Sequence, residues 1–207
     1  MTAVARTEIR LEVRKRIARV TLDGPPRNEM GIAFFESLAA FTETELKNLD
    51  VHGLILEGRG RHFSSGANVP EIETLGAESD GRVASLLTDN IRSFLTISNL
   101  PYPTAAVVRG CCLGAGMELA LACRFRVAEP NAVFALPEVT WGIMPGCGGT
   151  VRLPRLVGRA VAAELILSGR SVLADEAVDL GIADAPAERN RGVDVAIELF
   201  RRAGESQ

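Results

Sequence analysis

The stretch from Cys111 to Cys123 constrains the fold most, because it contains a helix-length segment that is apolar on nearly every face. A helix of this kind cannot lie at a surface and needs other elements packed all around it. Its only carboxylate is Glu118. A glutamate is almost never fully buried without a partner, because removing its charge from water is costly. The sequence therefore predicts an interior helix and a carboxyl group that either has a partner or has a use.

Strand-type and helix-type patterns alternate along the rest of the chain. Apolar and charged residues alternate over residues 9–13 and again over 18–22, which predicts an opening β-hairpin. We further expect helices over residues 31–47, 82–98, 149–157, 160–167, 174–180 and 193–202, and strands over residues 52–57, 104–108, 125–128 and 132–135. Such alternation predicts an α/β domain. We place its core at residues 1–187 and a short C-terminal helical tail at 188–207.

Composition narrows the partners and the compartment. The formal charge of −3 and the scattered basic residues argue against nucleic acid, and the basic run from Arg10 to Arg19 is read as a solvated hairpin face. Charged residues interrupt the first apolar positions and no stretch reaches membrane-spanning length, so we expect a cytoplasmic protein without a membrane partner. The four cysteines lack metal-ligand spacing, and we expect neither a metal site nor a disulfide.

Glu138 repeats the anomaly of Glu118, since it is the only charged residue between Pro130 and Val151. If both carboxyl groups face one pocket, their repulsion favours one protonated and one ionised group, as a general acid and a general base require. A second interpretation stays open at this point. Each glutamate could instead satisfy buried backbone donors or pair with an arginine, and the candidates are Arg109, Arg124 and Arg152.

Two glycine-containing segments, Phe63–Asn68 and Gly114–Gly116, have minimal side chains. Such segments let a ligand approach the main chain, and a helix N-terminus offers unpaired N–H groups, so two converging amides would form an oxyanion hole. The alternative is that these glycines only permit tight turns and close packing. Other site types are disfavoured, because residues 146–150 lack the lysine of a P-loop and neither a dinucleotide fingerprint nor a serine-hydrolase elbow occurs.

Four motifs occur in a recognisable order: Phe63-Ser-Ser-Gly-Ala-Asn68, Gly114-Ala-Gly-Met-Glu118, Pro137-Glu138 and Pro145-Gly-Cys-Gly-Gly-Thr150. Together they resemble the enoyl-CoA hydratase/isomerase (crotonase) superfamily. The resemblance implies a crotonase-like fold of repeated β-β-α units. In relatives, further helices beyond the equivalent of this chain's last residue cover the acyl pocket, so we expect a shortened C-terminal helical region.

The resemblance also assigns residues to roles. It implies that the amides of Ala67 and Ala115 hold the thioester oxygen, and that Glu118 and Glu138 are catalytic. It further implies substrate contacts at Ser65, Gly66, Asn68, Gly114 and Gly146. Gly146 matches a position that helps to orient water, and Asn68 stands where many relatives have aspartate.

The function that the resemblance implies is lyase chemistry of fatty acid metabolism. A hydratase of this kind adds water across the α,β double bond of an acyl-CoA thioester through an enolate. The substrate would be an acyl-CoA or acyl-carrier thioester, with no cofactor besides the coenzyme A that is part of it, and the enzyme a homo-trimer or hexamer. Alternatives are an isomerase, other enolate chemistry such as decarboxylation or C–C hydrolysis, and a non-catalytic acyl-CoA-binding subunit.

Overall fold

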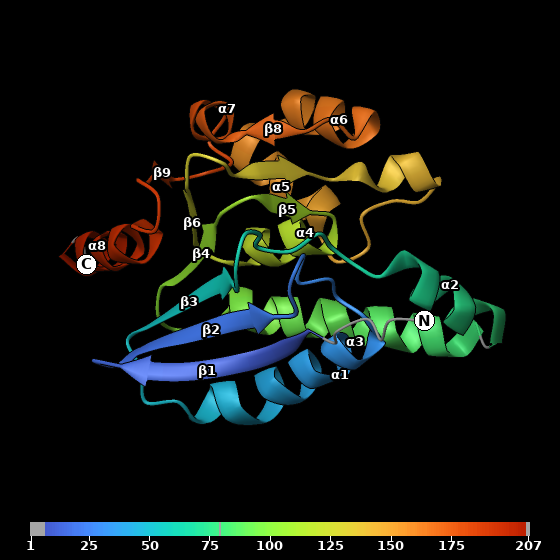
Figure 1. Cartoon of the computed structure of the whole chain (residues 1–207), viewed down its shortest axis with the longest axis horizontal. Coiled ribbons are helices and arrows are strands. Elements are labelled where there is room, and N and C mark those ends of the chain that lie inside the picture. The colour runs from blue at the N-terminus through green and yellow to red at the C-terminus, as the bar shows by residue number, and fades with distance from the viewer. Residues whose placement is uncertain (1–6, 79, 206–207) are drawn as a thin grey trace.

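The computed structural model describes residues 7–78 and 80–205 of the chain. In chain order the elements are β1 (Glu8–Arg14), β2 (Ile17–Asp23), α1 (Ile32–Ala40), η1 (Phe41–Glu45), η2 (Leu46–Asn48), β3 (Gly53–Gly58), α2 (Val69–Glu78), α3 (Asp80–Ser98), β4 (Thr104–Val108), β5 (Cys111–Leu113), α4 (Ala115–Ala122), β6 (Phe125–Ala128), β7 (Val133–Ala135), η3 (Pro137–Trp141), α5 (Gly149–Val157), α6 (Arg159–Ser168), β8 (Val172–Leu173), α7 (Ala174–Asp179), β9 (Ala185–Pro186) and α8 (Gly192–Glu205). The expected α/β class is confirmed (Figure 1).

The strands form two sheets within the described residues. The larger has six strands in the order β1-β2-β3-β4-β6-β9, and the smaller has the order β5-β7-β8. β1 and β2 make the expected hairpin, with Glu8 opposite Asp23 and Arg14 opposite Ile17. The remaining pairs of the larger sheet are parallel. All residues of β3 and β4 are buried, because helices cover both faces of the sheet at this point.

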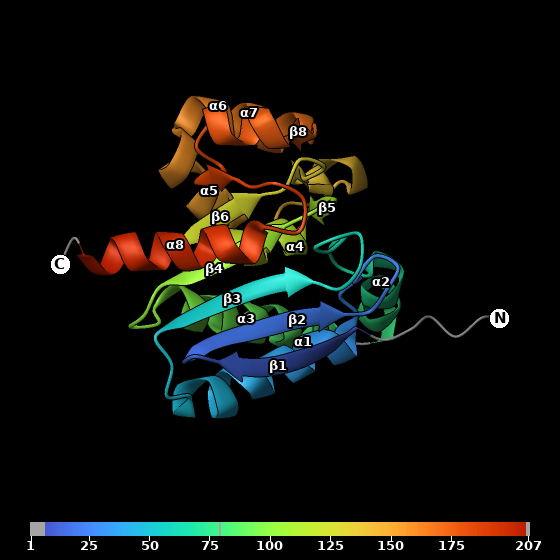
Figure 2. The ribbon, with the colours of Figure 1, turned by 60° about the vertical axis from the view of Figure 1, so that its left-hand side comes forward.

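Helices α1 and α3 lie on one face of the larger sheet and α8 lies on the other (Figure 2). The main core fills the space between the sheet and the helices α1, α3 and α4. A second cluster lies under α8 and consists of Ile55, Ala105, Val107, Val127, Ala196 and Phe200. The second sheet and the helices α5, α6 and α7 stack beyond α4, which is therefore enclosed on all sides (Figure 1).

A buried arginine joins β6 to the segment that follows α7. Arg126 is 2% exposed. Its guanidinium donates to the carbonyl oxygens of Ile182 at 2.6 Å and Cys123 at 2.7 Å, and to the Asp184 carboxylate at 2.7 Å. Because the bonds to Ile182 and Asp184 reach the segment after α7, Arg126 is a cross-link of the fold.

No helix in the described ranges is both long and apolar enough to cross a membrane.

Candidate active site

Helix α4 is buried along its whole length and carries Glu118, which is 2% exposed. The carboxyl oxygen Oε1 accepts the backbone N–H groups of Cys147 and Gly149, both at 2.8 Å. The alternative in which Glu118 satisfies buried backbone donors is therefore correct as a statement of contacts. It does not exclude chemistry, because both bonds use Oε1 and the other oxygen accepts no hydrogen bond from the described residues.

Glycine lets the segment Gly146–Gly149 approach Glu118 so closely. Gly148 has a φ of 104°, a left-handed conformation that residues with a side chain rarely adopt. A Cβ on Gly149 would lie 3.1 Å from Glu118 Oε1 and 3.0 Å from the Leu136 side chain. The glycine-rich loop, which lacks the lysine of a P-loop, thus presents backbone amides to a carboxyl group of the protein itself.

Opposing effects act on the pKa of Glu118. Burial raises the pKa above the ordinary range of a glutamate, whereas the bonds from Gly149 and Cys147 and the charge of Arg152 lower it. The Arg152 guanidinium also donates to the Cys147 carbonyl oxygen at 2.8 Å. Arg152 therefore supports the loop and favours the ionised form of Glu118 at the same time.

Glu138 lies on η3, where Pro137 occupies the first turn. Its Oε2 atom is buried and has no hydrogen-bond partner among the described residues. Burial raises the pKa of Glu138 to about 7, and the nearby charge of Glu118 adds to the effect. Glu138 is thus poised to carry or release a proton near neutral pH.

The structure brings Glu138 to the N-terminus of α4. A Cβ on Gly114 would lie 3.3 Å from Glu138 Oε1, and Gly114 has a φ of 51°. Gly114 is the residue before the first turn of α4. The two glutamates, although 20 positions apart in the sequence numbering, flank the same helix start.

The backbone amides of Ala67 and Ala115, expected to form an oxyanion hole, lie on two loops that approach each other. Met30 forms a parallel β-bridge with Ala67: the Met30 N–H donates to the Gly66 carbonyl oxygen at 2.8 Å, and the Asn68 N–H donates to the Met30 carbonyl oxygen at 2.9 Å. In this pairing the Ala67 N–H points away from Met30. Neither Ala67 N nor Ala115 N donates a hydrogen bond among the described residues. A Cβ on Gly66 would lie 3.5 Å from Ala115 N, so the two loops are in contact here.

The other expected site residues have different surroundings. The Ser65 hydroxyl oxygen is buried without a partner. Asn68 Oδ1 accepts the N–H of Glu71 at 3.1 Å at the start of α2, so the side chain caps that helix. Gly146 has only the Leu87 side chain within 4 Å of its Cβ position, at 3.3 Å.

The three arginines proposed as partners of the glutamates have different partners in the structure. Arg109 pairs with Glu57 at 3.0 Å and lies 3.8 Å from Glu129, so its partners are other carboxylates. Arg124 contacts neither site glutamate and lies over the ring of Phe125. Arg152 alone acts on Glu118.

Sequence reasoning missed the donors of Glu118. Cys147 and Gly149 contribute main-chain N–H groups, and a backbone donor has no residue-type signature. The signal that could have found them is the need of a buried carboxylate for donors, together with a glycine-rich turn that begins a helix.

A buried pair of carboxyl groups beside unpaired amides, on an α/β scaffold, defines a class of enzyme that performs acid/base chemistry. The chain belongs to the enoyl-CoA hydratase/isomerase family, whose sequence model matches residues 12–206. Both the recognised superfamily and the expectation of a hydratase-like enzyme are confirmed.

Individual relatives support this membership. The chain is 38% identical over 181 residues to a Bacillus subtilis protein named "Probable enoyl-CoA hydratase", a match that covers 87% of this chain and 69% of that protein. It is 36% identical over 192 residues to the fatty acid oxidation complex subunit alpha of Vibrio cholerae, covering 91% of this chain but only 27% of the relative. The chain thus spans about a quarter of that longer protein.

A solved structure supports the fold. The enoyl-CoA hydratase of Bacillus anthracis superposes with a TM-score of 0.85 at 30% identity, and the match covers 94% of this chain and 75% of that one. The expected crotonase-like fold is thereby confirmed.

Proposed function

We propose that the chain adds water across the α,β double bond of a 2-enoyl-CoA thioester. The observation that carries the proposal is the unequal environment of the two glutamates. Glu118 has two backbone donors and a nearby guanidinium that favour its carboxylate form, whereas Glu138 has a partnerless buried oxygen and a pKa of about 7. The pair therefore offers a base and an acid at once.

The chemistry follows from these positions. The N–H groups of Ala67 and Ala115 donate hydrogen bonds to the thioester carbonyl oxygen as negative charge develops on it. Glu118 removes a proton from water, and the water oxygen forms a bond with the β-carbon. The resulting enolate takes the proton of Glu138 at the α-carbon. The product is a 3-hydroxyacyl thioester, and proton exchange with solvent restores the two glutamates.

Coenzyme A is the carrier that we propose for the acyl group, and an acyl-carrier thioester is the alternative. A Thermobifida fusca protein solved in complex with acetoacetyl-CoA superposes with a TM-score of 0.84 at 27% identity. We propose no further cofactor, because the two glutamates and the amides supply the acid, the base and the oxyanion donors.

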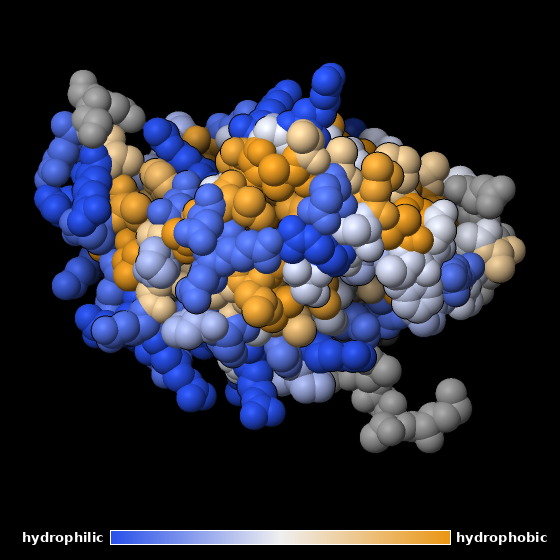
Figure 3. Space-filling view, turned by 90° about the horizontal axis from the view of Figure 1, so that it is seen from above, coloured by the Kyte–Doolittle hydropathy of each residue, from blue (hydrophilic) through white to orange (hydrophobic). Residues whose placement is uncertain are grey.

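The assembly that we propose is a homo-trimer or hexamer. Large apolar side chains are exposed on the side of the molecule where α6 and β8 lie, and Figure 3 shows hydrophobic residues gathered on this face. Leu167 is 73% exposed and Leu173 is 62% exposed. Apolar surface of this kind is typical of contacts between proteins. Light scattering after gel filtration measures the mass directly, and a monomer at micromolar concentration would contradict the assembly.

The cytoplasm is the compartment that we propose. All four cysteines are free and three of them are buried, which suits a reducing environment.

The test of the reaction is turnover in ¹⁸O-labelled water with short-chain and cyclic 2-enoyl-CoA esters. Hydration consumes the conjugated chromophore and places one labelled oxygen on the β-carbon. An isomerase would give product without label, and a decarboxylase would release carbon dioxide. Absence of turnover across the panel would sink the proposal. Loss of activity in both Glu118→Gln and Glu138→Gln distinguishes the enzyme from a trace contaminant.

A further inference from the structure

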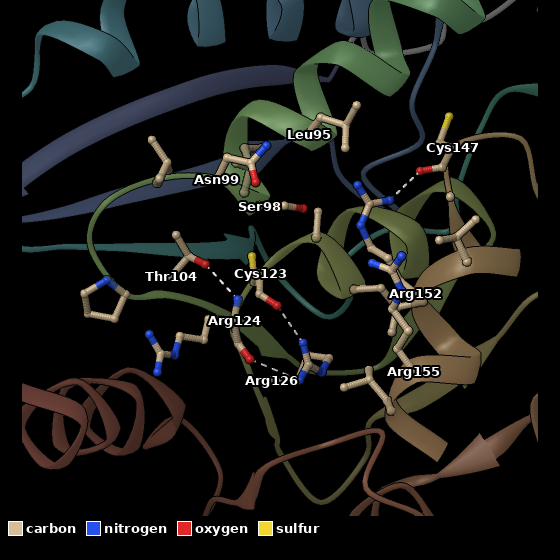
Figure 4. A pocket seen from close by; sticks show the side chains of 18 of the residues that line it. Leu95, Ser98, Asn99, Thr104, Cys123, Arg124, Arg126, Cys147, Arg152 and Arg155 are labelled. Carbon is tan, nitrogen blue, oxygen red and sulfur yellow. Dashed lines mark hydrogen bonds between the residues drawn. The ribbon is translucent and has the colours of Figure 1, made fainter. Parts of the chain in front are cut away.

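A cavity of about 1050 Å³ lies between the C-terminal ends of α3 and α8 and the helix α5 (Figure 4). Residues 145–148 form part of its wall. The same loop donates N–H groups to Glu118, yet neither glutamate, Ala67 nor Ala115 lines the cavity. The cavity therefore adjoins the candidate active site and shares with it Gly146, for which a substrate contact is expected, and the loop that donates to Glu118.

The charged side chains that line the cavity are all positive. Four arginines line the cavity, and no aspartate or glutamate of the described residues does. Arg126 is already occupied by its cross-links to backbone carbonyls and Asp184. The other three, Arg124, Arg152 and Arg155, form no ion pair with a carboxylate of the described chain. The charge of Glu118 balances Arg152 in part, so the positive charge without a counterion in the described chain is that of Arg124 and Arg155.

Two of these cations are neighbours on α5. Arg152 and Arg155 are three residues apart, so their side chains leave the same side of the helix. Burial lowers the pKa of Arg152, the charge of Glu118 raises it, and the charge of Arg155 lowers it by a smaller amount. Two guanidinium groups close enough to repel each other are a suitable pair of donors for one anion.

The rest of the wall is partly polar, at Ser98, Asn99, Thr104 and Thr150, and partly apolar. Ile91 and Leu95 of α3 are 41% and 48% exposed, and Val151 and Leu156 of α5 are 52% and 39% exposed. The volume lies slightly above the range of about 300–1000 Å³ that small-molecule sites occupy. A ligand with an anionic end and a hydrocarbon chain matches both parts of this wall.

We infer that this cavity is a second ligand site, which binds an aliphatic carboxylate with its charged end at Arg152 and Arg155 and its chain along Ile91, Leu95 and Leu156. No reacting group of the proposed hydration lines the cavity, although Arg152 also acts on Glu118. A free fatty carboxylate is the ligand class that this geometry selects.

Calorimetric titration of the whole chain with octanoate tests the site, with octanol and inorganic phosphate as probes that carry only one of the two features. We expect octanoate to bind at least about tenfold more tightly than either probe, because only octanoate uses both parts of the wall. Equal binding of octanol would show that charge is irrelevant. Equal binding of phosphate would show that the hydrocarbon wall is irrelevant, and no binding of octanoate would overturn the site altogether.

Two charge-removing variants locate the ligand. Arg155→Gln should weaken octanoate binding about tenfold, as loss of one charge-assisted hydrogen bond does. Arg159→Gln removes the same charge from the start of α6, outside the cavity, and should leave the dissociation constant within about twofold. Equal loss in both variants would mean that only net charge matters, and would overturn the assignment.

A last titration separates this cavity from the candidate active site. Octanoate should still bind in the presence of saturating acetoacetyl-CoA, since Gly146 is the only expected site residue among the lining residues of the described chain. Displacement of octanoate by acetoacetyl-CoA would overturn a second site. None of these measurements needs turnover, so they stand or fall separately from the hydration assay.

Discussion

Glu118 and Glu138 lie at opposite extremes of hydrogen bonding although their charges interact. Oε1 of Glu118 accepts two backbone N–H groups at 2.8 Å, whereas Oε2 of Glu138 is buried without a partner among the described residues. The asymmetry makes the two side chains non-equivalent before any substrate binds. It is the basis of the first three predictions.

Replacing Glu138 by glutamine should lower kcat about 10²–10⁴-fold, because the isosteric amide fills the same space but cannot deliver a proton. The rate is followed by the loss of enoyl-thioester absorbance. Circular dichroism of the variant should match that of the parent chain, which separates chemistry from folding. A variant with more than about a tenth of the parent activity would show that Glu138 is not the acid.

The pH profile of hydration should be bell-shaped. Glu138 acts in its protonated form, so kcat/KM should fall as pH rises above about 7, the value to which burial raises its pKa. Glu118 acts as the carboxylate, and its pKa is raised from 4.5, so the acid limb should lie above pH 4.5. A rate that keeps rising to pH 9 would contradict the assignment of Glu138.

The pH dependence of the free energy of unfolding should also reflect the protonation of Glu138. The folded-state pKa of Glu138, about 7, lies above the unfolded value of 4.5, so the folded chain binds more protons between these limits. The stability associated with the protonated group is present below pH 4.5 and is lost as pH rises through 7. The free energy of unfolding in urea should therefore fall more steeply over this window in the parent chain than in Glu138→Gln. Parallel curves would mean that burial of Glu138 has no such effect.

Gly114→Ala should impair the site, and Gly60→Ala is its matched control. Both glycines have positive φ, 51° and 78°, so both alanines should cost about 1–2 kcal/mol of stability. Only the Cβ at position 114 would lie against Glu138 Oε1, whereas nothing lies within 4 Å of one at position 60. We expect kcat to fall about 10²-fold in Gly114→Ala alone. Equal kcat in the two variants would separate Gly114 from the chemistry.

Arg126→Gln should destabilise the fold by about 3–5 kcal/mol, because it breaks the buried cross-link between β6 and the residues after α7. Arg155→Gln, at an exposed arginine, should change stability by no more than about 0.5 kcal/mol. Urea unfolding measures both. A small effect at Arg126 would show that water can replace its contacts.

The elements that could be predicted from the sequence are those whose residue pattern is visible within a few neighbouring positions. Two expected strands, residues 104–108 and 125–128, are β4 and β6 with the same bounds. Each is a short, mainly apolar run that follows Pro103 or Arg124, so its limits can be recognised from neighbouring residues alone. The strands β5, β8 and β9 were not expected. They have two or three residues each, and only pairing with distant segments makes them strands.

The candidate site divides in the same way. Glu118 and Glu138 could be selected because a charge in an apolar stretch is visible in one dimension. Their contacts could not, because Gly114, Cys147 and Gly149 act through main-chain atoms and through space that no side chain fills. The division of residues 1–187 and 188–207 into core and tail remains a prediction. The substrate roles of Ser65, Gly66 and Gly146 remain predictions as well.

The candidate site draws one amide from the loop after β3, another from the start of α4, and the donors of Glu118 from the turn before α5. No single segment of the chain contains all the groups that the reaction needs. Catalytic turnover would therefore serve as a reporter of complete tertiary structure. During refolding, activity should return only with the slowest of these segments, later than any signal that follows secondary structure alone.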